Sequence, residues 1–97
     1  MNNDLKVTQQ EYDACAYIQH MPYSDDFDAE FHAQVGVFLA EHGDSNAFLR
    51  ASSEARNLIG LCQLENDFSE IVRILPEQRG IIEAMFKRFG FECQTVS

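Results

Sequence analysis

The sequence has no tryptophan, and its 97 residues include only 2 prolines, 3 cysteines and 7 lysines and arginines. No apolar run approaches the ~20 residues that a membrane-spanning helix needs. The first residues, Met1 to Asp4, also lack the basic and then apolar pattern of a signal peptide. We therefore expect a cytoplasmic protein with no membrane contact.

The cysteines exclude two common kinds of small domain. Cys15, Cys62 and Cys93 are odd in number and widely spaced, and none belongs to a CxxC motif. This arrangement argues against a disulfide framework and against a zinc knuckle. Cys15 and Cys62 fall on apolar faces of expected helices, where a free cysteine acts as a small hydrophobic residue.

No motif for catalysis or cofactor binding is present. The sequence lacks a GxSxG elbow, a P-loop and a GxGxxG turn. His20, His32 and His42 do not have metal-ligand spacing. The acidic run at residues 25–28 lacks the alternating oxygen ligands and the glycine of a calcium loop. The sequence therefore predicts a protein that is not an enzyme and holds no cofactor and no metal.

The residues that are present suit one helical domain over residues 1–97. The eight phenylalanines and the aliphatic residues are enough for a single hydrophobic core without a metal or a disulfide. Thr8 and Glu11 have the spacing of a capping box, which predicts a first helix from about Gln9 to Met21 that Pro22 ends. Its inward residues are expected to be Tyr12, Cys15, Ile18 and Met21.

A second helix is expected to begin after Ser24 and to end near Gly43. Residues 25–28 place negative charge at the positive end of the helix dipole. Its apolar face is expected to contain Phe27, Phe31, Val35 and Phe38. Residues 35–40 also suit a buried strand, so the alternative is an α+β fold with a small hairpin around residues 35–50.

The rest of the chain predicts two or three further helices. A third, capped by Ser45, is expected to reach about Leu61, and Ser52 and Ser53 are poor helix formers that divide it. A short fourth helix over 68–75 is expected to meet a fifth over 76–89 in a tight corner, because the residue before a proline disfavours helical geometry. Gly90 suits a left-handed cap in which Phe91 packs on Phe86. The predicted fold is all-α, a compact irregular bundle of four to five short helices.

Charge departs most from the average. The chain carries a net charge of −9. Residues 1–47 contain nine acids and one lysine, a net charge of −8, whereas residues 48–97 contain seven acids and six bases, a net charge of −1. The electrostatic field of a surface with this negative charge repels nucleic acid and speeds encounter with a basic partner. Negative charge of this size also favours solubility by itself.

The charge spacing of the densest acidic segment resembles that of DNA. Between residues 25 and 30, four carboxylates occupy five helical steps of ~1.5 Å, or roughly 1.9 Å per charge, and duplex DNA carries one charge per ~1.7 Å. The principal partner contacts are predicted to be Asp25, Asp26, Asp28 and Glu30. Further acidic residues would add long-range attraction: Glu11, Asp13, Glu41 and Asp44.

These features favour a non-enzymatic inhibitor that presents its acidic half to a basic protein partner, a nucleic-acid-handling complex or a nuclease, and does not itself bind nucleic acid. Phage anti-restriction and anti-CRISPR proteins form a class that acts in this way. One alternative is an immunity protein or antitoxin that neutralises a cationic nuclease toxin. Another is a small homo-oligomeric adaptor joined through an apolar helix face. The sequence leaves monomer and homodimer both open.

Overall fold

The computed structural model describes residues 5–21 and 29–91. In these ranges the chain forms five α-helices: α1 (Gln9–Gln19), α2 (Ala29–His42), α3 (Ala47–Arg50), α4 (Ser53–Glu65) and α5 (Ser69–Phe89). No strand occurs within the same two ranges, so the all-α prediction is confirmed and the hairpin alternative around residues 35–50 is wrong.

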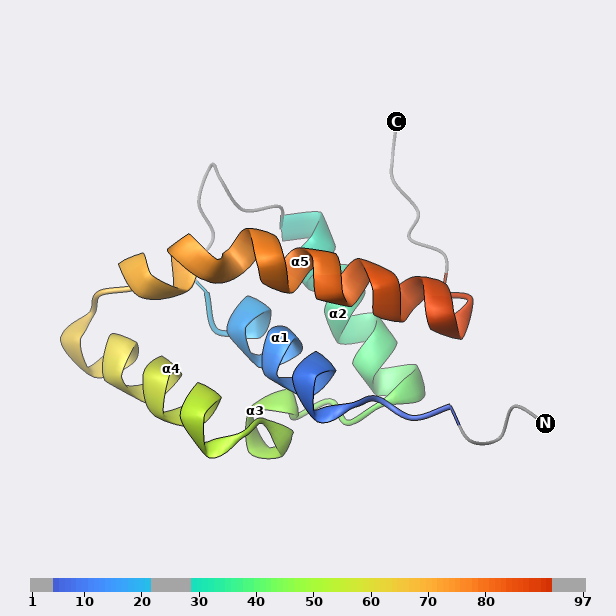
Figure 1. The fold of residues 1–97 in the computed structure, drawn as a ribbon, viewed down its shortest axis with the longest axis horizontal. Helices are drawn as coiled ribbons and strands as arrows, with labels where there is room; N and C mark the ends of the chain where they lie inside the picture. Colours follow the sequence, from blue (N-terminus) through green and yellow to red (C-terminus); the bar gives the residue numbers. More distant parts are fainter. Residues whose placement is uncertain (1–4, 22–28, 92–97) are drawn as a thin grey trace.

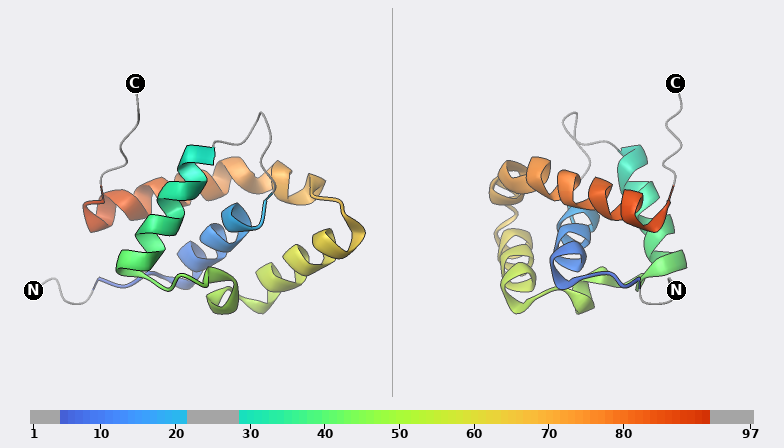
Figure 2. Two further views of the ribbon diagram at one scale, coloured as in Figure 1. Left: turned by 180° about the vertical axis from the view of Figure 1, so that it is seen from behind. Right: turned by 45° about the vertical axis from the view of Figure 1, so that its right-hand side comes forward.

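Helix α1 is the centre of the bundle. It lies between α2 and α4, with α5 packed along it (Figures 1 and 2). It contacts all four other helices, and most extensively α5 and α3. Because it is surrounded in this way, three consecutive residues, Ala14, Cys15 and Ala16, are fully buried, although an amphipathic helix buries only one face.

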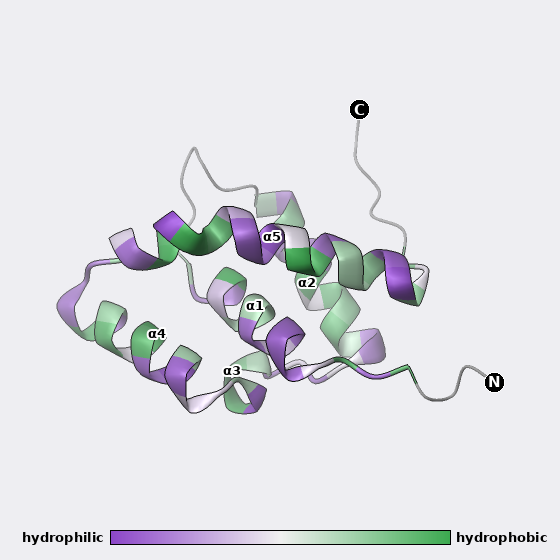
Figure 3. Ribbon diagram, in the orientation of Figure 1, coloured by the Kyte–Doolittle hydropathy of each residue, from purple (hydrophilic) through white to green (hydrophobic). Residues whose placement is uncertain are grey.

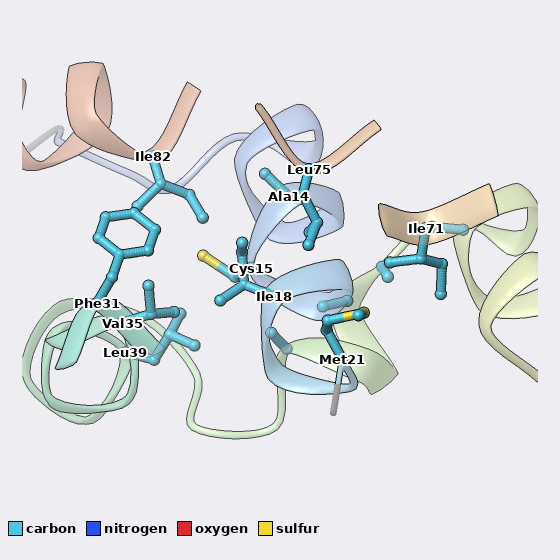
Figure 4. Close-up of a cluster of buried hydrophobic side chains, with 14 of the residues drawn as sticks. Ala14, Cys15, Ile18, Met21, Phe31, Val35, Leu39, Ile71, Leu75 and Ile82 are labelled. Atoms are coloured by element: carbon cyan, nitrogen blue, oxygen red, sulfur yellow. The ribbon is translucent and has the colours of Figure 1, made fainter. Parts of the chain in front are cut away.

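The core forms where α1, α2 and α5 meet. Figure 4 shows Cys15 and Ile18 of α1 among side chains from both neighbours. The largest fully buried side chains are Phe38, Ile18, Leu39, Ile59, Ile71, Ile82, Met85, Val35 and Cys15. Fully burying one such apolar side chain stabilises the fold by roughly 1.5–3 kcal/mol before entropy is subtracted.

The start of α1 follows the sequence prediction. The Thr8 hydroxyl accepts a hydrogen bond from the Glu11 N–H at 3.2 Å, and the Glu11 carboxylate accepts one from the Thr8 N–H at 2.9 Å. The predicted capping box is therefore confirmed. Helix α1 ends at Gln19, two residues earlier than predicted, and Met21 beyond it is still buried.

Helix α2 buries Phe31, Val35 and Phe38 on one face, as predicted, whereas Ser24 and Phe27 lie outside the described residues. The Phe38 ring meets rings from the end of α5, with centroid distances of 5.2 Å to Phe86 and 5.0 Å to Phe89. Such tilted and edge-on ring pairs stabilise the contact beyond the area that they bury. These rings join α2 to α5.

The carboxyl end of α5 forms the predicted cap. Gly90 has a positive φ of 70°, and the Phe91 N–H donates to the Phe86 carbonyl at 2.8 Å. The Phe91 and Phe86 rings lie 4.8 Å apart. This combination is a Schellman motif with its hydrophobic contact.

The predicted third helix is divided near Ser52 and Ser53 into α3 and α4, as expected, but its ends differ from those predicted. The side chain that caps α3 is Asn46 rather than Ser45. Ser52 caps α4, which continues to Glu65 rather than stopping at Leu61. Asn66 then takes the left-handed conformation, with φ of 54°, and turns the chain toward α5.

The predicted corner at Pro76 is wrong, because α5 runs without interruption from Ser69 to Phe89. A proline inside a helix removes one hydrogen bond and costs roughly 3 kcal/mol relative to alanine. Leu75 and Gln78 on either side of it are buried, in line with Ile71 and Ile82. Burial of this continuous face offsets the cost of the proline, which itself lies exposed on the outside.

Candidate functional site

Of the four predicted principal contacts, the structure describes only Glu30. Asp25, Asp26 and Asp28 lie outside the described residues. Glu30 is exposed in the first turn of α2, two residues after Asp28 in the chain. The acidic segment 25–30 therefore leads directly into an exposed helix end.

The outer face of α2 carries a carboxylate near each end. Glu41 is exposed in the last turn, 3.8 Å from His42 Nε2. Glu30 and Glu41 are separated by about three helical turns, which places them on one side of the helix about 16 Å apart. The exposed residues between them include Val37, which is 50% exposed. By helical spacing, this α2 outer face lies about a quarter-turn around the helix from the buried Phe31 and Phe38.

Glu11 has a role inside the fold. Its carboxylate is nearly buried and binds the Arg88 guanidinium through two nitrogens. Burial alone would raise the pKa of Glu11, but the hydrogen bonds from Arg88 and Thr8 outweigh it, so the pKa lies below its usual value. The charge of Glu11 is thus compensated within the molecule.

Asp13 links α1 to the start of α4. One carboxylate oxygen accepts the Ser52 N–H at 2.7 Å, and the other accepts the Ser52 hydroxyl at 2.9 Å. Gln9 Nε2 also donates to Asp13 at 3.0 Å. This carboxylate therefore fixes the α3–α4 junction onto α1.

Asp44 forms an ion pair at the surface. It accepts the Asn46 N–H at 2.9 Å and pairs with Arg50 Nε at 2.7 Å. The Asn46 hydrogen bond, followed by that of Arg50, lowers the pKa of Asp44. Two acids of the first half, Glu11 and Asp44, are thus paired with arginines of the second half.

Cys15, His20 and His42 make contacts within the fold. Burial, and the charge of Glu11, raise the pKa of Cys15 to about 12, which disfavours its reactive thiolate. His20 Nδ1 lies 2.9 Å from the Ala16 carbonyl, and the His42 ring packs 5.1 Å from that of Phe38. Over residues 5–21 and 29–91, no group of three His, Cys, Asp or Glu side chains is arranged to hold a metal ion.

A second surface was missed by the sequence predictions. Leu61 and Leu64 of α4 are 52% and 84% exposed. The available signal was the i, i+3 spacing of Leu61 and Leu64, which places them away from the buried Ala55, Ile59 and Cys62. It was hidden because the third helix was expected to end at about Leu61.

None of the helices in the described part of the chain is long and apolar enough to cross a membrane. No protein family model matches the sequence, and its comparison with curated proteins and with solved structures gave no match. The function must therefore be inferred from the charge and the surfaces of this chain.

Proposed function

We propose that this chain is a non-enzymatic binding protein that presents an acidic surface to a basic site on a partner protein and inhibits the partner by occupying that site. The observation that carries the proposal is the uneven charge, −8 over residues 1–47 and −1 over the rest. A basic groove that normally holds nucleic acid is the partner site that best matches such charge.

The proposed contact surface is the acidic segment 25–30 together with the α2 outer face. Asp25, Asp26 and Asp28 carry three charges within five residues of the exposed Glu30 in the sequence. Glu41 extends the negative surface to the other end of α2. Asp13 and the arginine-paired Glu11 and Asp44 are held by intramolecular contacts, so we assign them only to the long-range field.

The proposed inhibition is competitive with nucleic acid. Lysines and arginines that neutralise phosphates would instead meet carboxylates at a similar spacing. Complementary charge speeds association and makes it sensitive to salt. We therefore expect the complex to form fast at low ionic strength and to weaken as salt rises.

The test is capture of a partner by the tagged full-length chain, followed by calorimetry with the identified partner. The variant Asp25→Asn, Asp26→Asn, Asp28→Asn is expected to bind at least tenfold more weakly. A matched control, Glu70→Gln, Glu77→Gln, Glu83→Gln, changes net charge equally on the exposed side of α5. Equal affinity of the two triple variants would contradict the proposal, as would a partner that fails to lose nucleic acid when the chain binds.

A further inference from the structure

Helix α4 exposes more apolar surface than a packed helix normally does. Leu64 is 84% exposed and Leu61 is 52% exposed. Single exposed leucines are common on protein surfaces, but two at i, i+3 spacing form one continuous apolar area. Figure 3 shows apolar positions along α4, and Figure 1 shows this helix at the side of the molecule.

The area is distinct from the face that α4 uses for folding. Ala55, Ile59 and Cys62 are buried and make the contact with the rest of the bundle. Leu61 and Leu64 lie beyond the edge of that face, on the side from which Glu54 and Glu65 also project by helical spacing. We call these four residues the α4 leucine face: Glu54, Leu61, Leu64 and Glu65.

Acidic groups surround both ends of this face. Burial is the main cause of the raised pKa of Cys62, and the charges of Asp67, Glu70 and Glu65 add to it. These three carboxylates therefore lie near the carboxyl end of α4. Glu54 lies at the amino end, where it contributes in the same way to the raised pKa of Tyr17. The one basic residue of α4, Arg56, is five positions from Leu61, a spacing that puts it on a different side of the helix.

We propose that the α4 leucine face is a docking site for an amphipathic helix of another protein, one whose apolar residues are flanked by lysines or arginines. Apolar residues of such a helix would cover Leu61 and Leu64, and its cations would meet Glu54 and Glu65. This mode of recognition buries an apolar face and uses the charges around it for specificity. It involves residues other than those of the acidic segment 25–30.

A second copy of this chain fits the face poorly. A symmetric pair of antiparallel α4 helices would bring Glu54 of one copy toward Glu65 of the other. Like charges placed opposite each other oppose pairing, and the net charge of −9 adds to the repulsion. The charges of the face therefore favour a cationic partner over self-association.

The absence of tryptophan from the chain gives a clean binding assay. The probe is a synthetic amphipathic helix with one tryptophan, leucines at i, i+3, i+4 and i+7, and flanking lysines. A second peptide carries glutamates in place of the lysines. We expect the lysine peptide to bind the full chain, with a tryptophan emission shift, at least tenfold more tightly than the glutamate peptide.

Variants locate the binding site. Leu61→Gln with Leu64→Gln, and Glu54→Gln with Glu65→Gln, are each expected to weaken binding of the lysine peptide at least fivefold. Leu49→Gln, a substitution of the same kind at an exposed leucine of α3, is the matched control and should leave the affinity unchanged. Circular dichroism of every variant should show unchanged helix content, because the substituted residues lie outside the core.

Three results would overturn the proposal. They are equal binding by the leucine variant and the unaltered chain, preference for the glutamate peptide, and a concentration-dependent dimer in light scattering that the leucine variant abolishes. The triple variant at residues 25, 26 and 28 separates this site from the proposed inhibitory surface. It should keep the α4 docking site intact whether or not it loses the nucleic-acid-binding partner.

Discussion

Arg88 of α5 binds both carboxylate oxygens of Glu11 on α1, and the same guanidinium donates to the Lys6 carbonyl at 2.7 Å. Glu11 also completes the capping box with Thr8. One nearly buried carboxylate therefore fixes the start of α1, the residues before it and the last turn of α5. A surface ion pair, with both partners in water, has no comparable effect.

We expect Arg88→Ala to lower the free energy of unfolding by about 2 kcal/mol, because it leaves the Glu11 carboxylate without its cation. The side chain of Glu11 is 8% exposed and that of Arg88 is 38% exposed, so water partly replaces the lost contact. The loss should thus fall below the roughly 3–5 kcal/mol typical of a fully buried pair. Urea unfolding measures the difference.

Arg73→Ala is the control for that variant. Arg73 pairs with Glu70 on the exposed side of α5, and both side chains are more than half exposed. Such a pair contributes only roughly 0.2–0.5 kcal/mol. A loss from Arg88→Ala no larger than that from Arg73→Ala would show that the Glu11 pair does not anchor the fold.

Stability should decline in acid in a way that depends on Glu11. The pKa of Glu11 is lower in the folded chain than its usual value of 4.5. The folded state therefore binds this proton less readily than the unfolded state, so the stabilisation is complete above pH 4.5 and is lost as pH falls below it. Urea unfolding between pH 7 and pH 3 should show the stabilities of the unaltered chain and of Glu11→Gln converging toward acid; parallel curves would contradict this assignment.

Pro76→Ala should stabilise the protein. The substitution restores an N–H in mid-helix, where proline costs roughly 3 kcal/mol. It also loses the roughly 0.4–1 kcal/mol of stability that proline provides by restricting the unfolded chain. We expect a net gain of about 2 kcal/mol in urea unfolding. Glu77→Ala, at the neighbouring exposed position, should change stability by less than about 0.5 kcal/mol. A destabilised Pro76→Ala variant would instead indicate two helices meeting in a corner.

Cys15 should resist alkylation until the protein unfolds. With a pKa of about 12, roughly one thiol in ten thousand is ionised at pH 8, and the side chain is fully buried. Iodoacetamide treatment followed by peptide mass spectrometry should leave Cys15 unmodified in native buffer and modify it in urea. Rapid native labelling of Cys15 would mean that α1 is not enclosed by the other helices.

Asp13→Ala tests the link between α1 and α4. It removes the hydrogen bonds that hold the Ser52 N–H and hydroxyl, and bonds to a charged group contribute roughly 1.5–3 kcal/mol each at most. Since Asp13 is only half-buried, we expect a total loss of about 1–2 kcal/mol. Ser52→Ala should lose less when added to Asp13→Ala than when made alone, because either substitution removes the bond from the Ser52 hydroxyl to Asp13; additive losses would contradict that coupling.

Local signals in the sequence were sufficient for most helix ends and for the all-α fold. The Thr8–Glu11 capping box and the Gly90 cap were predictable because the bonding partners lie within five residues of each other. The buried face of α2 followed from the spacing of its large apolar residues. Such features depend on few tertiary contacts.

Long-range contacts explain what the sequence did not reveal. The continuity of α5 through Pro76 depends on its packing against α1, which local propensity does not contain. The pairing of Glu11 with Arg88 joins residues 77 positions apart, so the sequence indicated only the capping box and a contribution to the charge of the surface for Glu11. The exposure of Leu61 and Leu64 depends on how α4 sits against the bundle, and the spacing of its apolar residues indicates only that these two lie away from the buried side.

The packing of α1 against α5 also delays folding during synthesis. Helix α1 is synthesised before α5, yet its most extensive contact is with α5. The 70 residues from Gln19 to Phe89 take roughly 4–14 s to translate at about 5–20 residues per second. During those seconds Cys15 and Ile18 have no α5 to pack against, so we expect the nascent chain to be accessible to chaperones and proteases until α5 is synthesised.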